Sequence, residues 1–134
     1  MQVTFAADRD YCIAASERVL GAGRELSEYL DLENCFVGQT EGGFIAVMVN
    51  CDTADLLDIA VLEDSRGKGV ATALMSFMDK ECISRGVKEI FLEVRASNTP
   101  AISLYLKCGF EKISVRKKYY GDPTEDAVIM RKTL

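Results

Sequence analysis

Along the chain, apolar residues recur with two different periods, which predict strands and helices in a definite order. Residues 35–40 and 44–50 are rich in β-branched and aromatic residues and flank Glu41-Gly42-Gly43, so they predict a β-hairpin. The second run contains FIAVMV, which is apolar on both faces, so we expect this strand near the centre of a sheet. Another strand is predicted over residues 55–62, after a turn at residues 51–54.

The next segment has the period of a helix. An apolar stripe with the spacing i, i+4, i+7, i+8 predicts a helix that ends at about Arg85, and its members are Val70, Leu74, Phe77, Met78 and Cys82. Gly86 follows at the C′ position, and residues 87–94 predict a strand. Thr99-Pro100 predicts the start of a short helix that Gly109 ends.

The two ends of the chain give weaker patterns. Residues 2–5 alternate enough to predict a short edge strand. A helix capped at its start is predicted over residues 8–20, and a shorter helix over residues 24–30. Two final strands are predicted over residues 110–116 and 126–132.

The succession β-α-α-β-β-β-α-β-α-β-β predicts an α/β fold with one mixed sheet and helices on both faces. A chain of 134 residues, 49% of them apolar, suffices for one hydrophobic core, so residues 1–134 are expected to form a single domain. No apolar run approaches the ~20 residues that span a bilayer. The start, MQVTFAADRD, lacks the features of a signal peptide, so we expect a cytoplasmic protein with no membrane partner.

The composition excludes several kinds of chemistry. The chain has no histidine, which removes Ser-His-Asp and Cys-His catalysis and the common zinc sites. A general base must therefore be a carboxylate, a tyrosine, a lysine, a thiolate or a water. The five cysteines form no CxxC and lie mostly in apolar runs, so neither a disulfide framework nor a metal site is expected. A net charge of −5 argues against nucleic acid as a partner.

One segment between a strand and a helix, Arg66-Gly67-Lys68-Gly69-Val70-Ala71, has the character of an anion-binding turn. Glycines leave backbone N–H groups uncovered, and the first N–H groups of the helix have no partner inside it. A pyrophosphate would satisfy both groups, and Arg66 and Lys68 add positive charge. Two glycines after a strand also occur in simple turns, and the GxxxxGK[ST] spacing of a nucleotide triphosphatase is absent.

With this turn, the chain resembles the GNAT superfamily of N-acetyltransferases, whose pyrophosphate motif is (Q/R)xxGx(G/A). Four further segments, LEVRASN, LY…GF, RKKYY and EDAVIM, are similar to the ribosomal-protein-alanine N-acetyltransferases within it. The resemblance implies that the strand before the turn and the strand that holds Glu93 splay apart. It also implies that the pantetheine arm of acetyl-CoA lies between them and that the acetyl group passes directly to an amine.

The resemblance implies roles for individual residues. Glu93 would be the general base, and Tyr105 would protonate the departing CoA thiolate. The residues expected to bind the cosubstrate acetyl-CoA, with no metal, are Ile59, Ala60, Val61, Arg66, Gly67, Lys68, Gly69, Val70, Ala71, Thr72, Asn98 and Tyr105. Two features depart from the relatives: Asp58 stands where asparagine is more common, and the N-terminal third is short and lacks their Pro-Trp-Ser stretch.

These residues also have ordinary structural interpretations. Asn98 is as readily a helix cap as a CoA contact, and Cys108 is expected to pack in the core. Burial of Glu93 would make it a stronger base, and a nearby Asp58 would add to this effect. Arg95 could weaken it by pairing.

The basic run RKKYY at residues 116–120 is interpreted as the connection between the last two strands, either a solvated turn or a loop on the substrate side.

The function that the resemblance implies is acetylation of a protein N-terminal α-amine, in particular that of a ribosomal protein with N-terminal alanine. An acidic segment could attract a basic peptide or simply be solvated, and its carboxylates are Asp52, Asp55, Asp58, Glu63 and Asp64. One alternative is acetylation of a small-molecule amine. Another is a non-catalytic sensor of acetyl-CoA, against which Glu93 and Tyr105 count.

Overall fold

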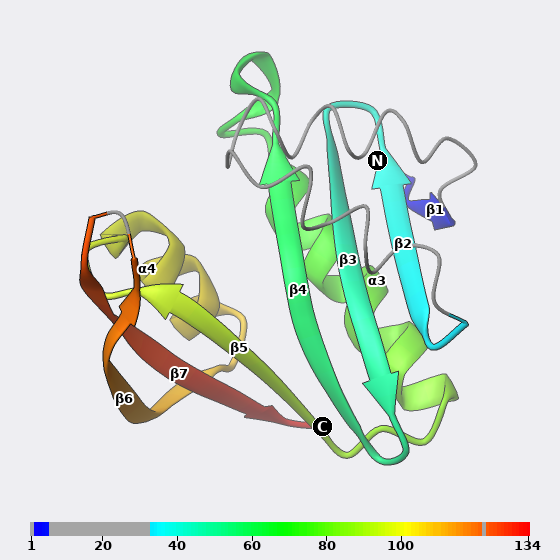
Figure 1. The fold of residues 1–134 in the computed structure, drawn as a ribbon. Coiled ribbons are helices and arrows are strands. Elements are labelled where there is room, and N and C mark those ends of the chain that lie inside the picture. Colours follow the sequence, from blue (N-terminus) through cyan, green and yellow to red (C-terminus); the bar gives the residue numbers. More distant parts are fainter. Residues whose placement is uncertain (1, 6–32, 122) are drawn as a thin grey trace.

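The computed structural model describes residues 2–5, 33–121 and 123–134 (Figure 1). The strands of these residues form one mixed sheet in the order β1-β2-β3-β4-β5-β7-β6. The strands are β1 (Thr4–Phe5), β2 (Cys35–Thr40), β3 (Gly43–Asn50), β4 (Thr53–Val61), β5 (Glu89–Arg95), β6 (Glu111–Tyr120) and β7 (Glu125–Thr133). The helices are α3 (Val70–Ser84), α4 (Thr99–Lys107) and a 3-10 turn, η1 (Glu63–Ser65).

The N-terminal half of the sheet is antiparallel and confirms the predicted hairpin. β2 pairs with β3 from Cys35↔Met48 to Thr40↔Gly43, so only Glu41 and Gly42 form the turn. β4 starts at Thr53, two residues earlier than predicted, because the turn after β3 is shorter. β1 pairs with β2 at the edge of the sheet, as predicted. The helices predicted over residues 8–20 and 24–30 lie outside the described residues.

Both described helices pack on the same face of the sheet. A single core cluster joins Leu74 and Met78 of α3 and Ile102 of α4 to inward-facing side chains of the strands, such as Ile45 of β3. Because side chains alternate along a strand, Phe44 points to the opposite face, and it too is fully buried. Burial on both faces confirms that the FIAVMV strand is central.

β4 and β5 are the parallel neighbours in the sheet, and they stay together over a short distance. Their pairing runs from Thr53↔Glu89 to Asp55↔Phe91, although β4 continues to Val61 and β5 to Arg95. Beyond these pairs the strands diverge, and Figure 1 shows the sheet opening between them. The splaying that the family resemblance implied is therefore present.

β6 corrects the prediction for the basic run. Residues 116–120 belong to a strand that extends to Tyr120, not to the connection that follows it. The register against β7 shifts between Arg116 and Tyr120, where Lys118 has a φ of 53°. This irregularity concealed the strand, because the alternation of side chains is lost there.

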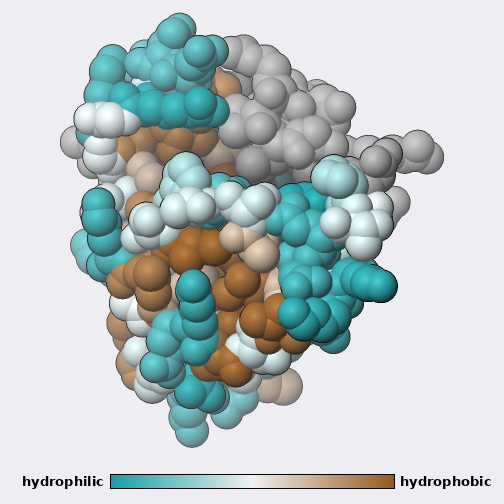
Figure 2. Space-filling model, turned by 90° about the vertical axis from the view of Figure 1, so that its left-hand side faces the viewer, coloured by the Kyte–Doolittle hydropathy of each residue, from teal (hydrophilic) through white to brown (hydrophobic). Residues whose placement is uncertain are grey.

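β6 is also an edge strand whose side chains are almost all exposed. Of the large hydrophobic side chains that are exposed in the described residues, several belong to α4 or β6, namely Leu106, Ile113, Val115 and Tyr119. Figure 2 faces the side of the molecule on which α4, β6 and β7 lie, and it shows apolar surface gathered in the middle with hydrophilic residues around it.

Candidate active site

The glycine turn leads from the end of β4 into α3. Gly67 and Gly69 have φ angles of 77° and 79°, which favour glycine because other L-residues rarely adopt them. Gly69 is the N-cap of α3, and no side chain caps that end. A Cβ added to either glycine would meet no atom within 4 Å, so the backbone faces open space. The turn thus offers uncapped N–H groups to an anion, as the sequence predicted.

Charged groups flank this turn. The Arg66 Nε donates to the Val61 carbonyl oxygen over 3.2 Å, which holds the start of the turn against the end of β4. Lys68 is exposed. Of the strand residues expected to bind acetyl-CoA, Ile59 and Val61 pack against the core and Ala60 is buried. Their role therefore remains a prediction.

A cleft of about 1010 Å³ opens where β4 and β5 diverge. Its walls come from β3, β4, β5, β7 and the end of β6. The lining residues are Met48, Asp55, Leu56, Leu57, Asp58, Phe91, Leu92, Glu93, Arg95, Arg116, Tyr119, Tyr120, Gly121 and Ile129. Glu93, Asp58 and Arg95 are thus brought together, whereas the turn and Tyr105 do not line this cleft.

An irregularity in β4 explains why two of its carboxylates face the cleft. Ala46 pairs with Asp58 and Val47 with Leu56, so Leu57 is an extra residue in the ladder. Residues three apart would normally face opposite sides of a sheet, but the extra residue puts Asp55 and Asp58 on the same side. Burial and the charge of Glu93 raise the pKa of Asp55. The other carboxylates of the acidic segment, Asp52, Glu63 and Asp64, are exposed and outside the lining.

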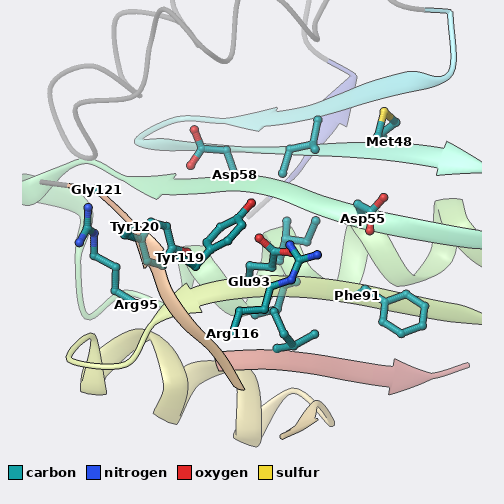
Figure 3. A pocket seen from close by; sticks show the side chains of 14 residues that line it. Met48, Asp55, Asp58, Phe91, Glu93, Arg95, Arg116, Tyr119, Tyr120 and Gly121 are labelled. Carbon is teal, nitrogen blue, oxygen red and sulfur yellow. The ribbon is translucent and has the colours of Figure 1, made fainter. Parts of the chain in front are cut away.

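The Glu93 carboxylate lies in the cleft and is held from β6. Arg116 Nη1 lies 3.1 Å from Glu93 Oε1. Tyr119 hydrogen-bonds to the same carboxylate, and this bond is the main cause that raises the pKa of the Tyr119 phenol. The Arg116 guanidinium also lies 5.0 Å from the centre of the Tyr119 ring. Figure 3 shows both side chains beside Glu93.

The structure answers two questions about Glu93 that the sequence left open. The side chain is not buried, since 36% of it is exposed, because the divergence of β4 leaves this part of β5 uncovered. Its arginine partner is Arg116 rather than Arg95. Arg95 pairs with Glu125 over 3.3 Å and stacks on the Tyr120 ring at 4.4 Å.

Tyr105 lies on α4 and is buried, with the Phe110 ring 6.0 Å away. Burial, followed by the charge of Asp58 and the neighbouring Tyr120 and Cys108, raises the pKa of Tyr105 to about 12. The effect of Asp58 shows that the phenol lies within electrostatic reach of the cleft. At neutral pH it is therefore a proton donor and not a base.

Asn98 and Cys108 have structural roles at the ends of α4. The Asn98 Oδ1 accepts a hydrogen bond from the Ala101 N–H over 3.3 Å, so Asn98 is the helix cap. The CoA contact implied for it remains a prediction. Cys108 packs against the core, and burial raises the pKa of its thiol, so it is not a reactive nucleophile.

Two further observations concern metals and membranes. In residues 2–5, 33–121 and 123–134 there is no cluster of three or more histidine, cysteine or carboxylate side chains suited to a metal ion. Neither helix of this part of the chain has the length and apolar character needed to cross a bilayer.

The family model for the acetyltransferase (GNAT) family matches residues 7–110, more than half of the chain. Among curated proteins, the [ribosomal protein bS18]-alanine N-acetyltransferase of Escherichia coli (strain K12) is 43% identical over 89 residues, 65% of this chain and 60% of that protein. The enzyme of the same name from Salmonella typhimurium is 38% identical over 112 residues, 81% and 74% of the two chains. The chain thus spans about 60% of the length of the first of these relatives.

Solved structures agree with this match. The Escherichia coli ribosomal-protein-S18-alanine N-acetyltransferase superposes with a TM-score of 0.79 at 29% identity, covering 98% of this chain and 94% of that one. A Bacillus subtilis acetyltransferase in complex with CoA gives a TM-score of 0.86 at 18% identity, covering 99% and 98%. The second likeness supports the fold alone.

Proposed function

Because the chain belongs to the acetyltransferase (GNAT) family, we propose that it moves the acetyl group of acetyl-CoA to a protein N-terminal α-amine in the cytoplasm. The acceptor class we favour is the N-terminal alanine of a ribosomal protein, as named for the relatives. The observation that carries the proposal is the Glu93 carboxylate, which opens into the cleft between the diverging strands.

Acetyl-CoA would be held by the turn at the start of α3. The uncapped N–H groups and the positive φ of Gly67 and Gly69 suit a pyrophosphate, and Arg66 and Lys68 supply local charge. This charge matters because the chain has a net charge of −5 and only nearby groups act unscreened. The acetyl-CoA supplies the thioester that is attacked.

Glu93 prepares the acceptor amine. An ammonium group loses a proton to the Glu93 carboxylate, directly or through a water, and the nitrogen gains a free electron pair. That pair forms the new C–N bond at the thioester carbonyl, and the C–S bond breaks with its electrons on sulfur. The nitrogen then loses a second proton to water, and the sulfur gains one from water, so the products are the acetylated amine, CoA and the proton that Glu93 releases.

Tyr105 would stabilise the sulfur that leaves. Full transfer of a proton from a phenol with a pKa of about 12 to a thiolate whose conjugate acid has a pKa of about 8.5 is uphill by about 5 kcal/mol. Tyr105 therefore acts best as a hydrogen-bond donor to the thiolate, with water as the final source of the proton.

The acceptor's own basicity favours an α-amine over a lysine. At pH 7 an α-amine with a pKa of ~7.8 needs about 1.1 kcal/mol to lose its proton, and a lysine with a pKa of ~10.4 needs about 4.6 kcal/mol. The base available for this step is one carboxylate, Glu93, in a chain that has no histidine. Removing a proton from an α-amine therefore suits Glu93 better than removing one from a lysine.

The test compares two peptides of one sequence with an internal lysine, one starting with a free alanine and one with that amine acetylated. Mass spectrometry after incubation with acetyl-CoA should find one added acetyl group on the free peptide and none on the blocked one. Equal modification of both peptides, or activity restricted to small-molecule amines in a parallel panel, would contradict the proposal.

A further inference from the structure

The ion pair between Arg116 and Glu93 places a guanidinium group on the carboxylate that the acceptor's ammonium group must reach. The guanidinium Nη1 is 3.1 Å from Glu93 Oε1, inside the lining of the cleft. A protonated acceptor amine needs the same carboxylate, because a carboxylate binds cationic donors more strongly than neutral ones. The two cations therefore compete for Glu93.

We infer that Arg116 occupies the position of the acceptor's ammonium group on Glu93 and that an acceptor binds by displacing it. This inference rests on the proposed function. In the absence of acceptor, Arg116 keeps the carboxylate paired. When an α-ammonium group enters the cleft, it takes the place of the guanidinium, and its proton is then removed.

The position of Arg116 permits this exchange. Its side chain is 57% exposed and extends from the edge strand β6, so it can rotate into water without opening the core. The backbone of Arg116 stays paired with Ala127 of β7, so only its side chain has to move. The contacts that Arg116 gives up on leaving are the pair with Glu93 and the stacking on the Tyr119 ring, at 5.0 Å from its centre.

The expected size of the effect follows from the exposure of the pair. Exposed ion pairs are worth at most about a fivefold shift in an equilibrium. Removing Arg116 should therefore lower the KM for the acceptor by about two- to fivefold, because the competing cation is gone. The value of kcat should stay within about twofold, because the guanidinium has already left Glu93 when the chemical step occurs.

The variants for this test are Arg116→Gln, Arg116→Lys and, as control, Lys117→Gln. Lys117 is the next residue on β6, pairs with Asp126 over 3.1 Å and lies outside the cleft lining, so its substitution makes the same charge change elsewhere. With saturating acetyl-CoA and an alanine-starting peptide, Arg116→Gln should lower KM. Arg116→Lys and Lys117→Gln should leave it close to the parent value.

A second readout follows Arg116 without turnover. Side-chain guanidinium NMR of the CoA-loaded protein should show the Arg116 Nη signals shifting when Ala-Ala-Ala-Ala amide is added, and not with its N-acetylated form. A raised KM, a tenfold loss of kcat or an unchanged KM in Arg116→Gln would overturn the inference while leaving the proposed function intact. If no peptide is acetylated by the parent protein, the proposed function fails, and this inference fails with it.

Discussion

Arg95 and Glu125 form an ion pair, with 3.3 Å between Nη1 and Oε2, although Arg95 lies only two residues from Glu93 on β5. The same Nη1 donates to the Pro123 carbonyl oxygen over 3.1 Å, and the guanidinium stacks on Tyr120. Figure 3 shows Arg95 turned toward Tyr120 at its end of the cleft. Arg95 thus fastens the connection between β6 and β7 to the end of β5.

Replacing Arg95 by alanine should loosen this end of the cleft. We expect the free energy of unfolding to fall by about 1–2 kcal/mol, because one ion pair, one carbonyl bond and one stacking contact are lost. The KM for the acceptor peptide should rise, because Tyr120 and Gly121 line the cleft. Urea unfolding and steady-state kinetics measure the two effects.

Arg85→Ala is the control for this variant. Arg85 is also paired and stacked, with Glu81 at 2.9 Å and the Phe36 ring at 4.8 Å, but it lies at the far end of α3. The Arg85→Ala variant should be less stable than the parent protein but have the same KM for the acceptor. A rise in KM for both variants would mean that the effect is one of general stability.

Glu93→Gln should retain acetyl-CoA binding and lose activity. The amide keeps the shape of the side chain but accepts no proton, and removing a general base typically costs 10²–10⁴-fold in rate. Initial rates from pH 6 to 9 should also show a changed pH profile. Glu111→Gln is the matched control, since Glu111 pairs with Arg131 over 3.1 Å outside the cleft. Parent-like rates for Glu93→Gln at every pH would refute the assigned role.

Gly69→Asp should abolish binding of acetyl-CoA, because it adds bulk and negative charge where the pyrophosphate is expected. Gly86→Asp makes the same change at the opposite end of α3, and both glycines have a φ of 79° and open space around them. The two variants therefore carry a similar conformational strain. Titration calorimetry should detect acetyl-CoA binding to Gly86→Asp and none to Gly69→Asp. Equal affinity in both would remove the turn from the binding site.

The sequence predicted the elements well where one period persisted. The hairpin follows from two short strand-like runs around a glycine turn and α3 from the helical spacing of its apolar stripe, and the observed elements match both predictions closely. The end of β6 was missed because a positive φ at Lys118 and a register shift interrupt the alternation of side chains. Local patterns carry no sign of such a break.

The partners within the cleft were harder to predict, because they depend on strand order. Glu93 pairs with Ile129 across one ladder and Arg116 with Ala127 across the next, so β7 separates the two strands that carry the ion pair. In the sequence, Arg95 lies close to Glu93 and was therefore the candidate considered as its partner. The side of the sheet that Asp55 shares with Asp58 also depends on an extra residue, Leu57, which the apolar run conceals.

Tyr105 should make the stability of the protein depend on pH in the alkaline range. Burial first, and then the charge of Asp58, raises the pKa of Tyr105 from 10.0 in the unfolded chain to about 12 in the fold. Below pH 10 both states carry the neutral phenol, so its contribution to stability is fully present. As the pH rises from 10 to 12, the unfolded state loses this proton while the folded state keeps it, and the free energy of unfolding falls.

Tyr105→Phe has no phenol to ionise, so its stability should decline less over this range. Between pH 10 and 12 the parent protein should therefore lose about 2 kcal/mol more of its free energy of unfolding than Tyr105→Phe, at a limit of about 1.36 kcal/mol for each pKa unit. The raised pKa of Cys82, about 11, acts in the same direction in both proteins and cancels in the comparison. Urea unfolding with a reductant at pH 9, 10.5 and 11.5 measures the free energy of unfolding of both proteins.

Tyr119→Phe is the control, because its phenol is half-exposed, and it should show a smaller change. If Tyr105→Phe declines as steeply as the parent, or if ultraviolet titration shows every tyrosine ionising near pH 10, Tyr105 is not the buried donor that the fold indicates.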